Sequence, residues 1–240
     1  MANESALWPG GPLFVPAPHA PLSTDSVLLA DFARPERAVR GVDLGCASGV
    51  LMLLLLERAP QLQMTGLELL EEPAELAREN LAKNGWSERG AVLTGDIRQH
   101  RSLFPPGRFD LAVSNPPYFP VGSGALSPDP ARATARGETA CSLEELCAAA
   151  AWLLRTGGSF CLVHKPERLA EIFVSMHAHG LEPKRLRPVC PRPDSAPSMV
   201  LIEGRRGGRS GLSVEPPLVL TEADGSESAE IKRIYHKETR

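Results

Sequence analysis

The sequence predicts an α/β domain in which helices cover both faces of a mainly parallel sheet. From residue 39 onward, short apolar runs of strand length alternate with longer segments that carry apolar residues at helical spacing. The 21 glycines and 23 prolines fall largely between these segments, as expected for fixed turns. A chain of 240 residues is long enough to bury a full core. Alternating strands and helices favour a parallel sheet, because each helix carries the chain back to the same edge.

Seven strands are expected in this sheet. They are at 39–44, 63–69, 90–94, 109–114, 159–164, 181–189 and 198–203. Helices are expected at 27–32, 50–59, 71–84, 143–154 and 166–179. A proline-rich connection joins the last two strands, which predicts an antiparallel pair and therefore one antiparallel strand near the C-terminus. We expect residues 1–23 to be an N-terminal extension, 24–204 the domain, and 205–240 a basic and polar tail that packs on the domain or is flexible.

Composition limits the classes of function. The 26 basic and 29 acidic residues give no global positive field, so any contact with nucleic acid must come from a local basic patch. The five cysteines lack zinc spacing, and we expect reduced thiols and no metal. The apolar run from Val50 to Leu56 is too short for a membrane span, and no signal-type segment is found at the N-terminus. These features predict a cytoplasmic protein with no membrane partner, and we expect a monomer.

A glycine-containing loop follows the first strand of the expected domain. It reads Asp43-Leu44-Gly45-Cys46-Ala47-Ser48-Gly49, and its glycines allow the backbone to approach a ligand closely. The spacing differs from the dinucleotide pattern G-x-G-x-x-G, and no G-K-[ST] phosphate loop is present. The loop therefore favours a nucleoside-type ligand over a cradled phosphate.

Two acidic residues occur at the ends of the next strands. Glu68 ends the second strand, where an acid accepts hydrogen bonds from the hydroxyls of a ribose. Asp96 follows the third strand and is expected to accept from an adenine amino group, with Ile97 against the ring. Each acid alone reads as a surface carboxylate, but together with the loop they converge at the carboxyl edge of the sheet.

The turn after the fourth strand is Asn115-Pro116-Pro117-Tyr118. The two prolines stiffen it and remove two backbone donors. The Asn115 side-chain oxygen and the Pro116 carbonyl can each accept one N–H of a planar amino group, and the Tyr118 ring offers a face on which that group can lie. A plain strand-ending turn is the alternative for these four residues alone.

Taken together, Asp43-x-Gly45-x-x-x-Gly49, Glu68, Gly95-Asp96 and the Asn115–Tyr118 turn resemble a class I S-adenosylmethionine-dependent methyltransferase over about residues 22–204. The turn resembles that of enzymes that methylate adenine N6, guanine N2 or glutamine N5. The segment 24–30, Phe119 and an arginine-bearing loop at 131–138 are most similar to the bacterial tRNA adenine-N6 methyltransferases that act on valine tRNA.

The resemblance implies a Rossmann-like fold and a set of roles. S-adenosylmethionine is the implied cofactor, and an anticodon-loop adenine of tRNA is the implied target. The implied catalytic residues are Asn115, Pro116, Pro117 and Tyr118. The implied cofactor-binding residues are Thr24, Asp25, Asp43, Gly45, Ala47, Gly49, Glu68, Asp96 and Ile97, with Thr24 or Asp25 at the methionine end. The implied substrate-binding residues are Phe119, Arg132, Arg136 and Lys165.

Two further expectations concern the loop and the RNA. Ala47 occupies a position where the family has glycine, and an alanine is tolerated there provided that its φ is negative. Basic residues between 181 and 211 are expected to flank the pocket mouth and hold phosphates. They are Lys184, Arg185, Arg187, Arg192, Arg205, Arg206 and Arg209.

Three alternatives stay open. A release-factor glutamine-N5 methyltransferase also fits the turn, but such enzymes carry a helical domain before the glycine loop, and only 42 residues precede Asp43 here. A guanine-N2 RNA methyltransferase fits as well. An RNA-binding scaffold that kept the fold is the non-enzymatic alternative, and binding of S-adenosylmethionine separates it from the others.

Overall fold

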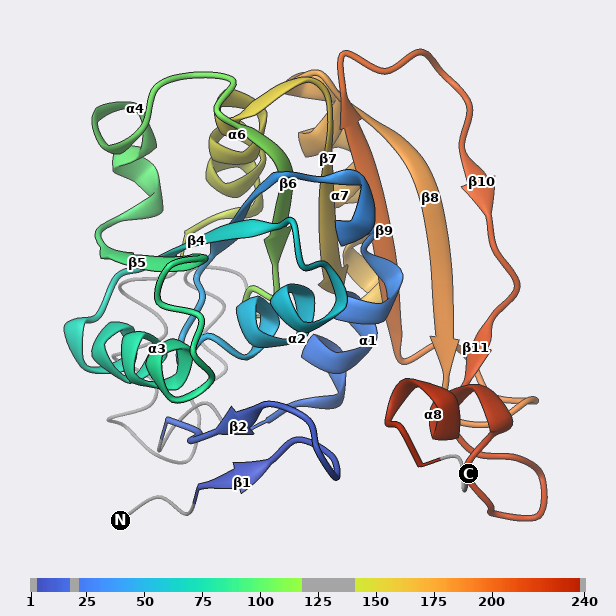
Figure 1. Ribbon diagram of the computed structural model, residues 1–240. Coiled ribbons are helices and arrows are strands. Elements are labelled where there is room, and N and C mark those ends of the chain that lie inside the picture. Colours follow the sequence, from blue (N-terminus) through green and yellow to red (C-terminus); the bar gives the residue numbers. More distant parts are fainter. Residues whose placement is uncertain (1–3, 18–21, 118–140, 238–240) are drawn as a thin grey trace, which may run out of the picture.

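The computed structural model of the protein describes residues 4–17, 22–117 and 141–237. A nine-stranded sheet runs through the molecule in the order β10-β8-β9-β7-β6-β3-β4-β5, with β11 beside β8 (Figure 1). Its long strands are β3 (Arg40–Leu44), β4 (Gln63–Glu68), β5 (Gly90–Thr94), β6 (Phe109–Ser114), β7 (Leu154–His164), β8 (Leu181–Cys190) and β9 (Met199–Arg206).

Strand directions confirm a mainly parallel sheet with one antiparallel strand near the C-terminus. Within the described residues, β9 runs against both of its neighbours, β7 and β8, and every other pairing in this sheet is parallel. The expected number of seven strands was wrong, because β10 (Ser213–Val214) and β11 (Leu218–Val219) also pair with β8. Strands of two residues are too short to show a periodic pattern in the sequence.

Helices cover both faces of the sheet, as predicted. On one face, the core contains buried residues of α1 (Thr24–Phe32), α2 (Val50–Arg58) and α3 (Glu71–Lys83). On the other face, it contains those of α6 (Leu143–Leu153) and α7 (Leu169–Ala178), and partly buried Leu103 of the short helix α4 (His100–Leu103) packs against them. The five leucines of α2 are all buried, which explains why this helix is apolar along its whole length. Both layers are visible in Figure 1.

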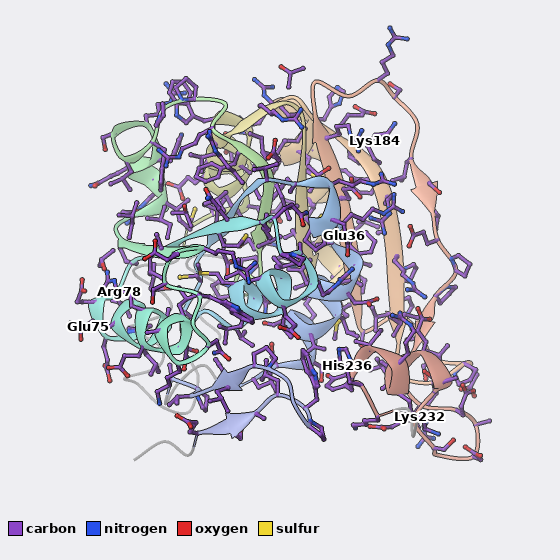
Figure 2. The ribbon with its side chains drawn as sticks, viewed as in Figure 1. Glu36, Glu75, Arg78, Lys184, Lys232 and His236 are labelled. Carbon is purple, nitrogen blue, oxygen red and sulfur yellow. The ribbon has the colours of Figure 1, made fainter. Side chains whose placement is uncertain are left out.

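The two ends of the described chain meet on one side of the molecule (Figure 1). The small antiparallel hairpin of β1 (Ser5–Ala6) and β2 (Leu13–Phe14) lies near α8 (Ala229–Ile234). Trp8 in the hairpin stacks on His236, with ring centroids 4.1 Å apart; His236 is labelled in Figure 2. Through this stacking, and through the pairing of β10 and β11 with β8, described residues after β9 contact the rest of the fold.

Asn80 of α3 and Asn84, the residue after this helix, hold the N-terminal segment. The Asn84 side chain accepts from the Leu13 N–H and donates to the Leu13 carbonyl, both at 2.8 Å. Asn80 makes the same pair of bonds with Val15, at 3.0 and 2.9 Å. The amide of Asn80 also donates to the Ser48 carbonyl at 2.9 Å, so the N-terminal segment is linked directly to the glycine loop.

Candidate active site

The glycine loop follows β3 and turns through the left-handed region of the backbone. Gly45 has a φ of +81° and Gly49 a φ of +82°, a region that favours glycine. The Gly45 N–H donates to the Leu67 carbonyl at 2.8 Å, which fixes the loop to β4. A Cβ added to Gly45 would meet no atom within 4 Å, whereas one on Gly49 would lie 3.1 Å from the Cβ of Ala77. The loop is open at Gly45 and closely packed at Gly49.

Ala47 does not meet the condition under which the sequence predicts that an alanine is tolerated at this position. Its φ is positive, at +46°. The cause is local: the Ala47 N–H donates to Oε2 of Glu68 at 2.9 Å, and the left-handed conformation directs it there. For an L-residue, this conformation costs about 1–2 kcal/mol, and such strain is found where a site needs a fixed geometry.

Asp43 lies at the floor of the loop. Its side chain is fully buried near the end of β3, and within the described residues neither carboxylate oxygen has a hydrogen-bond partner. Burial, and next the negative charge of Glu68, raise the pKa of Asp43 to about 8. A buried carboxylate without a partner, beside the open space at Gly45, suits a ligand that brings positive charge and hydrogen-bond donors. The residues present therefore fit a cationic nucleoside cofactor.

Glu68 ends β4, and Asp96 follows β5, as predicted. Glu68 accepts from the N–H of Ala47 and from that of Leu70, the second at 3.1 Å, which holds its carboxylate beside the loop. Asp96 caps the short 3-10 helix η2 (Ile97–Gln99) and binds the guanidinium of Arg98, with Oδ2 2.6 Å from Nη2. Hydrogen bonds from Arg98 hold the pKa of Asp96 below its usual range. Arg98 therefore holds the Asp96 carboxylate in its ionised form.

Asn115 follows β6 directly and meets the beginning of α1. Its side-chain Nδ2 donates to the hydroxyl of Ser26 at 3.0 Å and lies 3.4 Å from that of Ser23. Pro116 is half-buried and Pro117 exposed. Four other residues predicted for the site, Tyr118, Phe119, Arg132 and Arg136, lie outside the described residues.

The beginning of α1 differs in detail from the expectation. Ser23 caps the helix by accepting from the Ser26 N–H at 3.3 Å. Thr24 is exposed and Asp25 half-buried in the first turn. Ser26, not one of the residues predicted for the site, is buried against Asn115. Its signal in the sequence was its position three residues after a helix cap, which places both serines on one side of the first turn.

One hydrogen bond joins the two halves of the site. The buried hydroxyl of Ser114 donates to the carbonyl of Leu44 at 2.7 Å. β3 and β6 are adjacent and parallel, so Leu44 and Ser114 end at the same edge of the sheet. The structure thus brings Asp43, the glycine loop and the Asn115 turn together, as predicted.

The carboxyl end of β7 adds two residues to this edge. Lys165 is exposed just beyond the strand, and its Nζ lies 3.4 Å from the Ser198 carbonyl, to which it donates. His164, not one of the residues predicted for the site, is buried, and its Nδ1 accepts from the Lys165 N–H at 2.8 Å. Burial, and next the positive charge of Arg168, lower the pKa of His164 to about 4, so the ring is neutral at pH 7.

Part of the expected RNA-binding patch has another role. Arg185 bonds with the carboxylates of Glu203 and Glu215, at 2.6 and 2.7 Å. Arg187 forms a bidentate ion pair with Glu230, with N–O distances of 2.9 and 2.7 Å. For these two arginines the expectation was wrong, because acids from neighbouring segments of the tail and of β9 neutralise them.

Within residues 4–17, 22–117 and 141–237, no group of three His, Cys, Asp or Glu side chains is arranged to hold a metal ion. In the same ranges, no helix has both the length and the apolar character that a membrane span requires.

The fold and this edge of the sheet define a class I methyltransferase, in which a glycine loop and acids at consecutive strand ends stand beside a proline-stiffened turn. The family model of the methyltransferase small domain matches residues 21–177, and the chain belongs to that family.

Relatives of similar length extend over most of the chain. A Porphyromonas gingivalis protein named tRNA1(Val) (adenine(37)-N6)-methyltransferase is 35% identical over 77% of this chain and 74% of its own. A protein of the same name from Serratia proteamaculans is 33% identical over 89% of this chain and 81% of its own.

Solved structures agree with the fold. A crystal structure of a predicted O-methyltransferase from Agrobacterium tumefaciens has a TM-score of 0.73 at 23% identity, covering 89% of this chain and 96% of its own. A geranyl diphosphate methyltransferase in complex with S-adenosylmethionine has a TM-score of 0.56 at 16% identity, covering 75% of this chain and 84% of its own. At these identities the likeness concerns the fold alone.

Proposed function

We propose that the protein transfers a methyl group from S-adenosylmethionine to N6 of an adenine next to the anticodon of valine tRNA. On this proposal it works in the cytoplasm as a monomer. Two curated relatives at 33% and 35% identity carry the name of this activity, and each is covered over about three quarters of its length or more. The observation in the molecule that carries the proposal is the junction of the Asn115 turn with the glycine loop through Ser114 and Leu44.

The residues of the loop are assigned to the cofactor. Gly45, Ala47 and Gly49 shape the loop, Asp43 faces its positive charge, and Glu68 takes the ribose hydroxyls. Asp96 and Ile97 hold the adenine ring, and Thr24 and Asp25 lie at the methionine end. When bound, S-adenosylmethionine supplies a methyl group already activated by its sulfonium.

The residues of the turn are assigned to the target base. Asn115 and the Pro116 carbonyl each accept one hydrogen of the amino group, while Pro117 keeps the turn rigid. These two bonds fix the plane of the amino group and turn the nitrogen lone pair toward the methyl donor. Orientation and exclusion of water supply most of the rate, because no strong general base is needed. An amide such as Asn115 cannot act as a base in any case.

The base must leave its stack to reach the turn. This costs a few kcal/mol, and least for an unpaired loop nucleotide. Stacking on an aromatic ring returns about 1–3 kcal/mol, a role proposed for Tyr118 with help from Phe119. Arg132, Arg136 and Lys165 are assigned to the RNA backbone, and of these Lys165 lies at the carboxyl end of β7 beside the turn.

The substrate is identified by product analysis. The protein is incubated with labelled S-adenosylmethionine and either total tRNA or a release factor, and the labelled product is digested. Label in N6-methyladenosine of valine tRNA is the expected result. Label in N2-methylguanosine or in N5-methylglutamine would replace the proposed substrate, and absence of cofactor binding would favour the scaffold alternative.

Substitution of Asn115 tests the mechanism. Asn115→Ala is expected to lower kcat by about two orders of magnitude or more, a loss typical of a preorganised hydrogen-bonding group, while cofactor affinity is retained. Gln63→Ala removes an exposed amide at the beginning of β4, away from the site, and serves as the matched control. Wild-type turnover in Asn115→Ala would exclude this role.

A further inference from the structure

A second group of charged residues lies at the end of the sheet opposite the candidate active site, where β6 and β7 begin. A cavity of about 210 Å³ opens there between the beginnings of β6 and β7, the end of β9 and the short 3-10 helix η1 (Pro35–Arg37). Four arginines and two acids line it: Arg34, Arg37, Arg155, Arg205, Asp110 and Glu203. Because β6 begins at this cavity and ends at the Asn115 turn, the two sites lie at opposite ends of the same strand.

Asp110 neutralises one of the four arginines. Its Oδ1 accepts from Nε of Arg155 at 2.5 Å. Its Oδ2 accepts from the backbone N–H groups of Val39 and Arg40, both at 2.9 Å. Both oxygens are occupied, so Asp110 and Arg155 form a neutral pair at the wall of the cavity.

Glu203, the second acid of the cavity, makes its hydrogen bonds with Arg185 and Ser159, neither of which is among the remaining arginines of the cavity. Its Oε2 accepts from Arg185 at 2.6 Å, and its Oε1 accepts from the Ser159 hydroxyl at 2.9 Å. Nη2 of Arg205 is 3.7 Å from Oε1 of Glu203, which is beyond hydrogen-bond distance. The negative charge of Glu203 is therefore neutralised mainly by Arg185.

Three guanidinium groups remain without a full partner. Nε of Arg205 is buried and has no acceptor among the described residues. Arg34 and Arg37 are exposed, and neither makes an ion pair with any residue that the structure describes. Two acids do not neutralise four arginines, so positive charge remains at the cavity and favours an anion from outside the chain.

We propose that this arginine cavity binds a phosphate group through Arg34, Arg37 and Arg205. The planar guanidinium fork matches two oxygens of a phosphate, and such charge-assisted pairs are stronger than neutral hydrogen bonds. The phosphate belongs either to a nucleic-acid backbone or to a small free molecule.

Titration with inorganic phosphate tests the site. Calorimetry at pH 7 and low salt is expected to show saturable binding of one phosphate per chain. The Arg34→Gln/Arg37→Gln double variant is expected to weaken it at least fivefold. Both side chains are exposed, so the fold is preserved. Arg101→Gln removes an exposed charge outside the cavity and is the control, expected to bind as the wild type. Absence of saturable binding in the wild type, or equal weakening in the control, would overturn the proposal.

Binding of tRNA at several salt concentrations identifies the source of the phosphate. If it belongs to a nucleic-acid backbone, the double variant binds tRNA more weakly, and the slope of log K against log salt falls by about 1–2. If it belongs to a small molecule, tRNA affinity and slope stay at the wild-type values while phosphate binding is lost. Both outcomes support the site and assign its ligand. Neither depends on which amine is methylated, so the site stands or falls separately from the proposed function.

Discussion

The hydroxyl of Ser114 donates to the carbonyl of Leu44 at 2.7 Å, and this bond ties the two functional segments of the protein together. Ser114 directly precedes Asn115, and Leu44 is the second residue of the glycine loop. A displacement of either strand end is therefore transmitted to the other. In the proposed mechanism this bond keeps the amine acceptors in register with the cofactor loop.

Ser114→Ala is expected to impair both stability and turnover. It leaves the buried Leu44 carbonyl without its side-chain donor, which costs about 1–3 kcal/mol in the free energy of unfolding. It is also expected to lower kcat about tenfold, because small displacements in a preorganised site are costly. Urea unfolding and single-turnover kinetics measure the two effects. Ser102→Ala is the control, since Ser102 makes a similar bond to the Gln99 carbonyl at 2.9 Å on the exposed α4. An unaltered kcat in Ser114→Ala would remove the bond from the mechanism.

Ser26 is expected to act as a positioning residue for Asn115. Its hydroxyl accepts from Nδ2 of Asn115, which sets the orientation of the amide and turns Oδ1 to the opposite side. Ser26→Ala allows the amide to rotate, so we expect kcat to fall about tenfold, corresponding to ~1.4 kcal/mol of transition-state stabilisation.

The pattern of kinetic effects separates positioning from a loss of structure. In Ser26→Ala, the KM for S-adenosylmethionine is expected to stay within about twofold of the wild type, because the substitution does not change how the enzyme binds the cofactor before the reaction. Ser26→Thr keeps the hydroxyl and is expected to recover most of kcat. Equal losses in both variants would show that packing at the buried Ser26, and not its hydrogen bond, is responsible.

Ala47→Gly is expected to stabilise the protein. The φ of +46° strains an alanine by about 1–2 kcal/mol, and glycine removes this strain at a cost of about 0.5–1 kcal/mol in backbone entropy. The expected net gain in the free energy of unfolding is about 0.5–1 kcal/mol. Ala91→Gly, at an exposed strand position with negative φ, is the control and should lose about as much. If both variants lose stability equally, Ala47 carries no strain.

The sequence predicts the skeleton of the site because strand ends are visible in it. Asp43, Glu68 and Asn115 each stand at the end of an apolar run, and parallel strands bring such ends to one edge. The contributions of Ser26 and Ser114 were missed, because a serine that bonds across the fold has no periodic signature. The partners of Arg185 lie on β9 and in the tail, so its ion pairs depend on tertiary contacts that local patterns do not show.

Asp43 gives the protein a pH dependence of known sign. Its folded-state pKa of about 8 is raised above the usual value for an aspartate, mainly by burial and then by Glu68. The folded chain therefore keeps a proton that the unfolded chain releases. The stability that this proton contributes is present below the unfolded pKa of about 4 and is lost as the pH rises through the folded pKa of about 8. Without cofactor, we expect wild-type stability to fall between pH 6.5 and 8, a window above the titration of His164.

Asp43→Asn tests this linkage and the proposed role in cofactor binding together. The variant should be more stable than the wild type at pH 8, and its advantage should grow with pH by at most about 1.4 kcal/mol per unit. Asp110→Asn is the control: burial favours its protonation, but Arg155 and backbone N–H groups hold the pKa of Asp110 below its usual range, so the variant should lose stability equally at pH 6.5 and 8.

The cofactor's positive charge favours the ionised form of Asp43, so binding to the wild type should release protons near pH 7 and tighten as the pH rises. Calorimetry in buffers of different ionisation enthalpy counts those protons. Asp43→Asn should bind with no such release, because an amide does not titrate. The same proton release from the variant would place the titrating group elsewhere and separate Asp43 from the charge of the cofactor.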